Sequence, residues 1–122
     1  MTTRRLWPLL ADLACVLALA IGGRGSHEPG ESFLVVLRIA WPFAVAALVA
    51  HAVLAWRAMR PSALWPSGVT VLVVTYAGGM ALRALSGRGL APGFLVVAFL
   101  FLAATVLGWR VVVAVARRVR GS

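Results

Sequence analysis

Four long apolar runs dominate this sequence, and they restrict the chain to a small set of folds. The runs cover residues 6–23, 33–56, 69–85 and 94–116. A helix needs roughly 20 mainly apolar residues to cross a hydrocarbon core of about 30 Å, and each run meets or nearly meets that length. Apolar residues make up 62% and charged residues 12% of the 122 residues, which is too apolar for one soluble core of this size. We therefore expect an all-α, integral membrane four-helix bundle that forms a single membrane domain over residues 1–122.

Short connectors rich in glycine, proline and serine separate the runs, and they leave no room for a water-soluble domain. Pro42 lies inside the second run, where it removes the N–H that would bond the carbonyl of Arg38. We therefore expect a kinked second helix. Gly78 and Gly79 predict a close approach between the third helix and a neighbour.

Arginine is distributed unequally between the two sides that four crossings define. The side with both termini and the second connector carries seven arginines and no acid: Arg4, Arg5, Arg57, Arg60, Arg117, Arg118 and Arg120. The other side carries Arg24, Arg83 and Arg88 against Glu28 and Glu31. Arginine-rich loops stay in the cytoplasm, so we predict a multi-pass protein of the inner (plasma) membrane with both termini in the cytoplasm. The basic tail 117–122 then lies on the cytoplasmic side.

The net charge of +9 would also fit a nucleic-acid-binding protein, but the arginines are split among loops and tails. Anionic lipid headgroups account for them, at about 1 kcal/mol per arginine near the membrane surface. We therefore expect the lipid bilayer and anionic headgroups as partners, and no nucleic acid; a homo-oligomer or another membrane protein is left open. A cleaved signal peptide is the alternative for the first run, which Asp12 disfavours because it interrupts the apolar stretch.

Three ionisable residues share one depth in the predicted membrane. Asp12 follows the start of the first run by six residues, while His51 and Arg110 precede the ends of their runs by five and six. These positions correspond to a layer about 8–9 Å inside the cytoplasmic surface. The simplest pairing joins Asp12 to Arg110 with His51 nearby, either as a structural ion pair or as a proton relay or binding site.

A second polar group gathers at the opposite end of the predicted bundle. Arg83 shares one face of the third helix with Thr75 and Gly79, and it can point toward the same vestibule as Arg38. With Arg24 and His27 these residues form a candidate external site for an anion or a lipid headgroup. The alternative is that Glu28 and Glu31 simply neutralise the arginines.

Catalytic motifs are absent from the sequence: we find no HExxH, no Walker loop and no dinucleotide fingerprint. The single Cys15 excludes an intrachain disulfide and a cysteine-rich metal site. We therefore expect no enzyme activity, no cofactor and no metal, with an intramembrane enzyme using Asp12 and His51 as the less favoured alternative.

Five short motifs follow one another in order: Asp12, IGGRGSHE at 21–28, WPF at 41–43, GMALR at 79–83 and GWR at 108–110. In this ordered set the sequence resembles the bacterial and archaeal domain-of-unknown-function family numbered 3054. It departs slightly from the family's pattern at Gly23. The resemblance implies a small multi-pass membrane protein and no established activity. Arg38 and His51 lie outside the motifs, which weakens a role for them.

Two functions remain as hypotheses. The first is a noncatalytic accessory or lipid-interacting subunit. The second is a small proton-coupled transporter or exporter that uses Asp12, because the length and the acid in the first helix look like small multidrug exporters. The off-centre carboxylate and the strong arginine bias disfavour the second, since dual-topology dimers need a weak bias.

Overall fold

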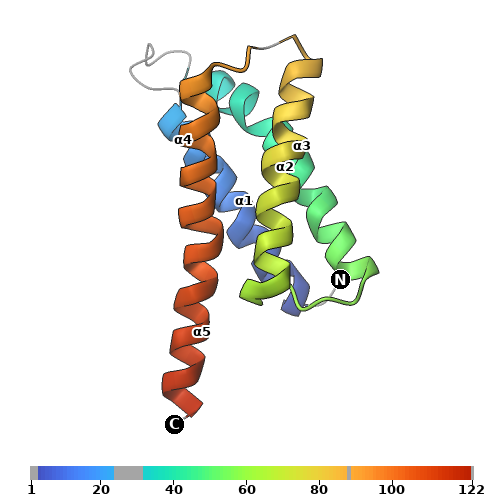
Figure 1. Cartoon of the computed structure of the whole chain (residues 1–122), viewed down its shortest axis with the longest axis vertical. Coiled ribbons are helices and arrows are strands. Elements are labelled where there is room, and N and C mark those ends of the chain that lie inside the picture. Colours follow the sequence, from blue (N-terminus) through green and yellow to red (C-terminus); the bar gives the residue numbers. More distant parts are fainter. Residues whose placement is uncertain (1–2, 24–31, 88, 122) are drawn as a thin grey trace.

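The computed structural model describes residues 3–23, 32–87 and 89–121, and every regular element among them is helical (Figure 1). In chain order the elements are α1 (Thr3–Gly23), α2 (Ser32–Trp56), the short segment η2 (Leu64–Gly68), α3 (Val69–Leu85), α4 (Pro92–Leu102), the π-type segment η3 (Ala103–Leu107) and α5 (Gly108–Gly121). The backbone of η2 is kinked at Trp65, which has an extended conformation. The last three elements follow one another without a break and form one long rod, the α4–α5 rod (Figure 1). The all-α fold class is thus confirmed for the described residues.

Four helical stretches are long and apolar enough to cross a membrane: Thr3–Gly22, Leu34–Trp56, Leu64–Leu85 and Pro92–Gly121. Large apolar side chains such as those of Leu10, Val49 and Leu100 are exposed on the outer surface. An apolar surface of this extent is unusual for a protein surrounded by water but is typical of one surrounded by lipid tails. The chain is therefore a membrane protein.

The α4–α5 rod is longer than a membrane core is thick. Its 30 residues correspond to about 45 Å at 1.5 Å per residue, against a hydrocarbon core of about 30 Å. In Figure 1 the end of α5 extends past the other helices. The predicted run 94–116 is shorter than the rod because it ended at the first basic pair. Arginine favours helix nearly as well as leucine does, so the helix continues to Gly121.

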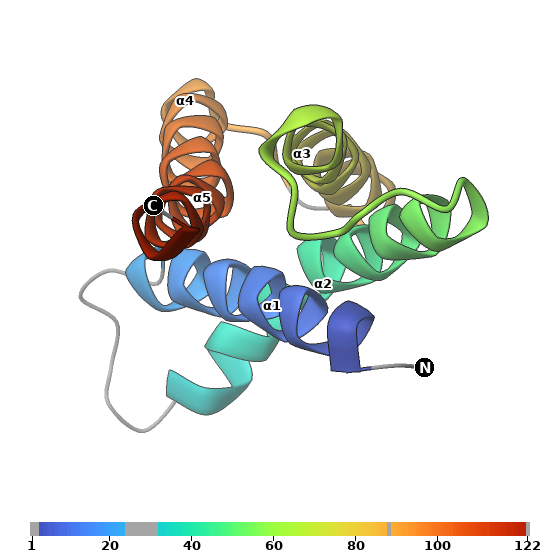
Figure 2. The same ribbon diagram turned by 90° about the horizontal axis from the view of Figure 1, so that it is seen from below.

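The helices pack in a ring in which α2 contacts α1 and α3, and the α4–α5 rod packs against α1 and α3 (Figure 2). The buried apolar core draws on every layer: Val16 and Leu19 of α1, Phe43, Ala47 and Leu54 of α2, Val71 and Met80 of α3, and Ala98, Leu102 and Val106 of the rod. Gly79 permits the close approach of α3 to α2, because a Cβ atom there would overlap the ring of Phe43. Pro42 lies inside α2, which remains one helix from Ser32 to Trp56; the kink expected there stays a prediction.

The connection between α2 and η2 is held in a defined conformation. Ala58 adopts a left-handed backbone with φ 55°, which reverses the chain after α2. The Ser67 hydroxyl then donates a hydrogen bond to the carbonyl of Arg60. Pro61 and Ser62 are buried, and the carbonyl of Pro61 accepts hydrogen bonds from Arg110.

Candidate functional site

Asp12, on α1, is the centre of a buried polar cluster. Its side chain is 1% exposed and accepts hydrogen bonds on both carboxylate oxygens. Trp109 Nε1 and Arg110 Nη1 each donate to Oδ1 at 2.8 Å. Arg110 Nη2 donates to Oδ2 at 2.8 Å, and His51 Nε2 lies 2.6 Å from the same oxygen. A carboxylate has about four acceptor positions, so these contacts fill it.

Arg110 has a partner for every one of its N–H groups, although it is fully buried. Besides Asp12, Nη1 donates to the carbonyl of Val106 at 3.0 Å. The carbonyl of Pro61 accepts from Nη2 at 2.9 Å and from Nε at 3.2 Å. The guanidinium carbon lies 4.3 Å from the ring centroid of Trp109. A buried guanidinium is tolerated only when it is paired and hydrogen-bonded throughout, and this one meets both conditions.

We call this group the Asp12 cluster: the side chains of Asp12, His51, Trp109 and Arg110 with the carbonyls of Pro61 and Val106. It joins α1, α2, the α2–η2 connection and the α4–α5 rod. The junction of η2 and α3 also lies against the cluster, because a Cβ atom on Gly68 would lie 2.7 Å from Cδ of Arg110. The glycine therefore admits the stem of the arginine, and all four spans meet at the cluster.

The local structure of the rod places two adjacent residues of the cluster. The π-type segment η3 ends immediately before α5, and Thr105 Oγ1 donates to the carbonyl of Phe101 at 2.8 Å within it. Neighbouring residues on a helix point about 100° apart. Arg110 therefore enters the bundle centre, while Trp109 lies beside it and packs edge-on against Trp7, with ring centroids 5.2 Å apart.

The chemistry of the Asp12 cluster is that of a saturated ion-pair network. Both carboxylate oxygens and all guanidinium donors are engaged within the protein, which leaves no open position for a ligand. Among residues 3–23, 32–87 and 89–121, no group of three or more His, Cys, Asp or Glu side chains could hold a metal ion. The arrangement links α1, α2, the α2–η2 connection and the α4–α5 rod.

The candidate external site is only partly described. Arg24 and His27 lie outside the described residues. Arg38 is exposed on α2. Arg83 Nε donates to the carbonyl of Gly89 at 3.0 Å, and its guanidinium carbon lies 4.3 Å from the ring centroid of Phe94. Arg83 thus holds the connection between α3 and α4, and an anion or headgroup site at this end stays a prediction.

Three members of the Asp12 cluster were not expected from the sequence: the side chain of Trp109 and the carbonyls of Pro61 and Val106. Trp109 Nε1 donates to Asp12, and the place of this residue next to Arg110 in the GWR motif was the available signal. The carbonyl of Pro61 had no signal, because any residue carries a carbonyl and only the path of the connection brings this one to Arg110.

Four membrane-length helices joined by a buried Asp–Arg–His–Trp cluster define a helical membrane protein with an internal ion-pair network. The chain belongs to the family described as protein of unknown function, DUF3054, which matches residues 9–113. The resemblance drawn from the five motifs is thereby confirmed, and the match spans all four side chains of the Asp12 cluster. No curated protein and no solved structure matches the chain.

Proposed function

We propose that this protein is a noncatalytic, multi-pass component of a bacterial plasma membrane, acting as an accessory or lipid-interacting subunit. Both termini and the tail 117–122 lie in the cytoplasm. The observation that carries the proposal is the saturation of the Asp12 cluster. The seven arginines on the side of the termini support the orientation.

The closed cluster favours a structural carboxylate over a transporting one. A membrane carboxylate that couples proton movement to transport must exchange protons with water, and such residues face the bundle interior or a water-filled cavity. Asp12 is instead 1% exposed and held by a bidentate guanidinium. Releasing it would leave the charge of Arg110 buried without its partner, at a cost of about 3–5 kcal/mol.

The cluster also supports a noncatalytic role. A nucleophilic mechanism needs a hydroxyl or thiol within hydrogen-bond reach of its base. The described hydrogen bond of the His51 ring goes to Asp12, and the remaining contacts of Asp12 go to Trp109 and Arg110. An Asp–His pair also occurs in catalytic triads, but among the described residues no hydroxyl or thiol bonds to the His51 ring, so the pair lacks a nucleophile.

Reconstituted liposomes test the function. Wild-type protein and Asp12→Asn are placed in vesicles of phosphatidylethanolamine and phosphatidylglycerol that contain a pH-sensitive dye, and a proton gradient is applied with a panel of cationic substrates. We expect no substrate-dependent proton flux from either protein, because the carboxylate is closed off. Flux that appears with the wild type and disappears in Asp12→Asn would instead establish the transporter.

Orientation is tested by cysteine labelling in a Cys15→Ala background. Gly89 and Gly121 are suitable positions, because a Cβ atom at either has nothing within 4 Å. A membrane-impermeant maleimide is expected to label Gly89→Cys in intact cells and Gly121→Cys only after lysis. The reverse pattern would contradict the proposed orientation.

A further inference from the structure

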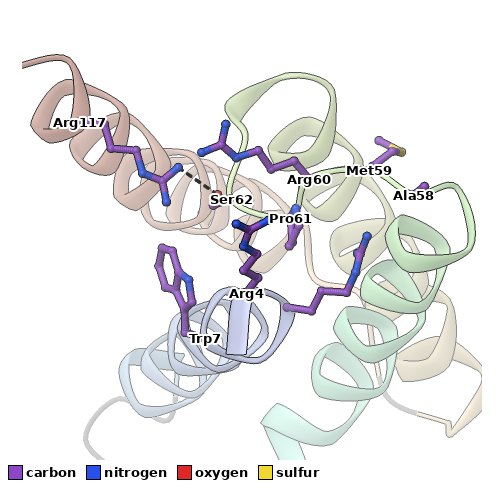
Figure 3. A pocket seen from close by; sticks show the side chains of 9 residues that line it. Arg4, Trp7, Ala58, Met59, Arg60, Pro61, Ser62 and Arg117 are labelled. Carbon is purple, nitrogen blue, oxygen red and sulfur yellow. Dashed lines mark hydrogen bonds between the residues drawn. The ribbon is translucent and has the colours of Figure 1, made fainter. Parts of the chain in front are cut away.

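A pocket of about 860 Å³ opens at the end of the bundle that carries the termini (Figure 3). We call it the basic pocket, and it is lined by Arg4, Arg5, Trp7, Ala58, Met59, Arg60, Pro61, Ser62 and Arg117. The lining comes from the start of α1, from the α2–η2 connection and from the end of α5. Figure 3 shows the side chains of Arg4, Arg60 and Arg117 directed toward the region around Ser62.

The charge of the basic pocket is not balanced within the described residues. Four of the nine lining residues are arginines, and no acid is among them. Asp12 is the one acid in the described part of the chain, and it is engaged by Arg110 and His51. Arg117 Nη1 donates to Ser62 Oγ at 3.4 Å, a contact that leaves its charge uncompensated. Four guanidinium groups around one cavity repel one another, and an anion removes that repulsion.

The shape and chemistry of the lining select a class of anion. Guanidinium groups bind phosphate through paired, charge-assisted hydrogen bonds. A volume of about 860 Å³ lies within the roughly 300–1,000 Å³ that is usual for small-molecule sites, so a phosphate with an attached organic group fits. Trp7, Met59 and Pro61 supply an apolar part of the lining for that organic group. We infer that the basic pocket binds a phosphate-bearing anion: the headgroup of an anionic phospholipid or a soluble phosphate ester.

The Asp12 cluster preorganises this pocket. Pro61 lines it, and the carbonyl of the same residue is held by two donors of Arg110. The backbone of Arg60 is fixed by the Ser67 hydroxyl. Trp7 lines the pocket on the α1 side and packs against Trp109 of the cluster. Binding sites whose lining is already fixed lose less entropy when the ligand arrives.

The lipid headgroup as ligand rests on the proposed function, because a headgroup reaches the pocket only if this end of the bundle lies at a phospholipid surface. The soluble phosphate ester does not. It is tested on the full-length protein with Arg4→Gln/Arg60→Gln as the pocket variant. The matched control is Arg118→Gln/Arg120→Gln, which removes the same charge from exposed positions outside the lining.

Two probes separate the sources. Native mass spectrometry from nanodiscs of phosphatidylcholine with a minority of phosphatidylglycerol reports bound phospholipid. Calorimetry in detergent with inorganic phosphate and glycerol phosphate reports soluble anions. We expect one bound anion per chain in the wild type and in the control, and an affinity at least about tenfold lower in the pocket variant. If the pocket variant loses affinity only for phosphatidylglycerol, the ligand is a lipid headgroup. If it loses affinity for the soluble probes, the ligand is a phosphate ester.

An equal loss of anion affinity in the pocket variant and the control would overturn the inference, because anion binding would then depend on net charge alone. That result leaves the proposed lipid-interacting function standing, whereas Asp12-dependent transport would overturn that function and leave the pocket untouched. Wild-type protein that binds neither probe also overturns the inference. Should the glutamine pair fail to fold, Arg4→Lys/Arg60→Lys keeps the charge but removes the guanidinium fork, and it is expected to lower affinity while the control does not.

Discussion

The Asp12 cluster and the basic pocket use the same residue type in opposite ways. Arg110 is fully buried, and each of its N–H groups has a partner within the protein. Arg4 and Arg60 are exposed at the rim of a cavity and have no ion-pair partner among the described residues. Pro61 belongs to both regions, with its carbonyl on Arg110 and its side chain at the pocket.

The surroundings of each arginine decide its role in this protein. A saturated, buried guanidinium is part of the fold, because removing it leaves other charges unpaired. An unsaturated one at a cavity is available to bind a ligand and contributes little to the fold. Variants of the two regions test this contrast.

Arg110→Met is expected to have the largest effect on stability. It leaves the carboxylate of Asp12 buried without its cation, and breaking a buried ion pair in this way costs about 3–5 kcal/mol. Thermal unfolding in detergent, followed by circular dichroism, measures the loss. Arg118→Met, at an exposed position on the same helix, is the matched control and is expected to change stability by less than about 0.5 kcal/mol. Equally small losses in both would contradict a structural role for the cluster.

Replacing both charges is expected to be less damaging than replacing either one. Asp12→Leu/Arg110→Met removes the pair together, so neither charge remains buried alone. The same unfolding assay on the two single variants and the double variant gives the coupling free energy, which we expect to be at least about 1 kcal/mol in favour of the double. A double variant that loses the sum of the two single losses would show that Asp12 and Arg110 act independently.

Gly68→Ala is expected to destabilise by about 1–3 kcal/mol, because the new methyl group overlaps the stem of a side chain that cannot move. The Cβ atom would lie 2.7 Å from Cδ of Arg110. Gly108→Ala is the control: nothing lies within 4 Å of its Cβ position, so helix propensity is expected to raise stability by up to about 1 kcal/mol. If Gly68→Ala were as stable as Gly108→Ala, the α3 junction would not depend on Arg110.

Arg60→Gln is expected to leave stability within about 0.5 kcal/mol of the wild type, since its guanidinium is exposed. The same protein is expected to retain less phosphatidylglycerol in nanodiscs than the wild type. Thermal unfolding and phosphatidylglycerol retention are measured on the same preparation, so that both quantities can be compared directly with those of Arg110→Met. A large stability loss without a change in lipid retention would reverse the roles assigned to the two regions.

Much of the fold follows from the sequence, and so does part of the cluster. The apolar runs correspond to helices because a chain in lipid must satisfy its backbone hydrogen bonds within each span. Counting residues from the ends of the runs also placed Asp12, His51 and Arg110 at one depth, and the structure brings these three together. Counting works here because the helical rise is constant.

Tertiary structure alone decided the remaining features. Depth does not specify which face of a helix a residue occupies, so counting residues alone did not identify the Trp109 contact or the Pro61 carbonyl. The basic pocket depends on bringing together residues 4–7, 58–62 and 117, which only the packed bundle does. The sequence determined that this is a basic, four-helix membrane protein, because hydropathy and charge act along the chain. Packing between distant segments decides which arginines pair with a carboxylate and which face a cavity, so these roles depend on the tertiary structure.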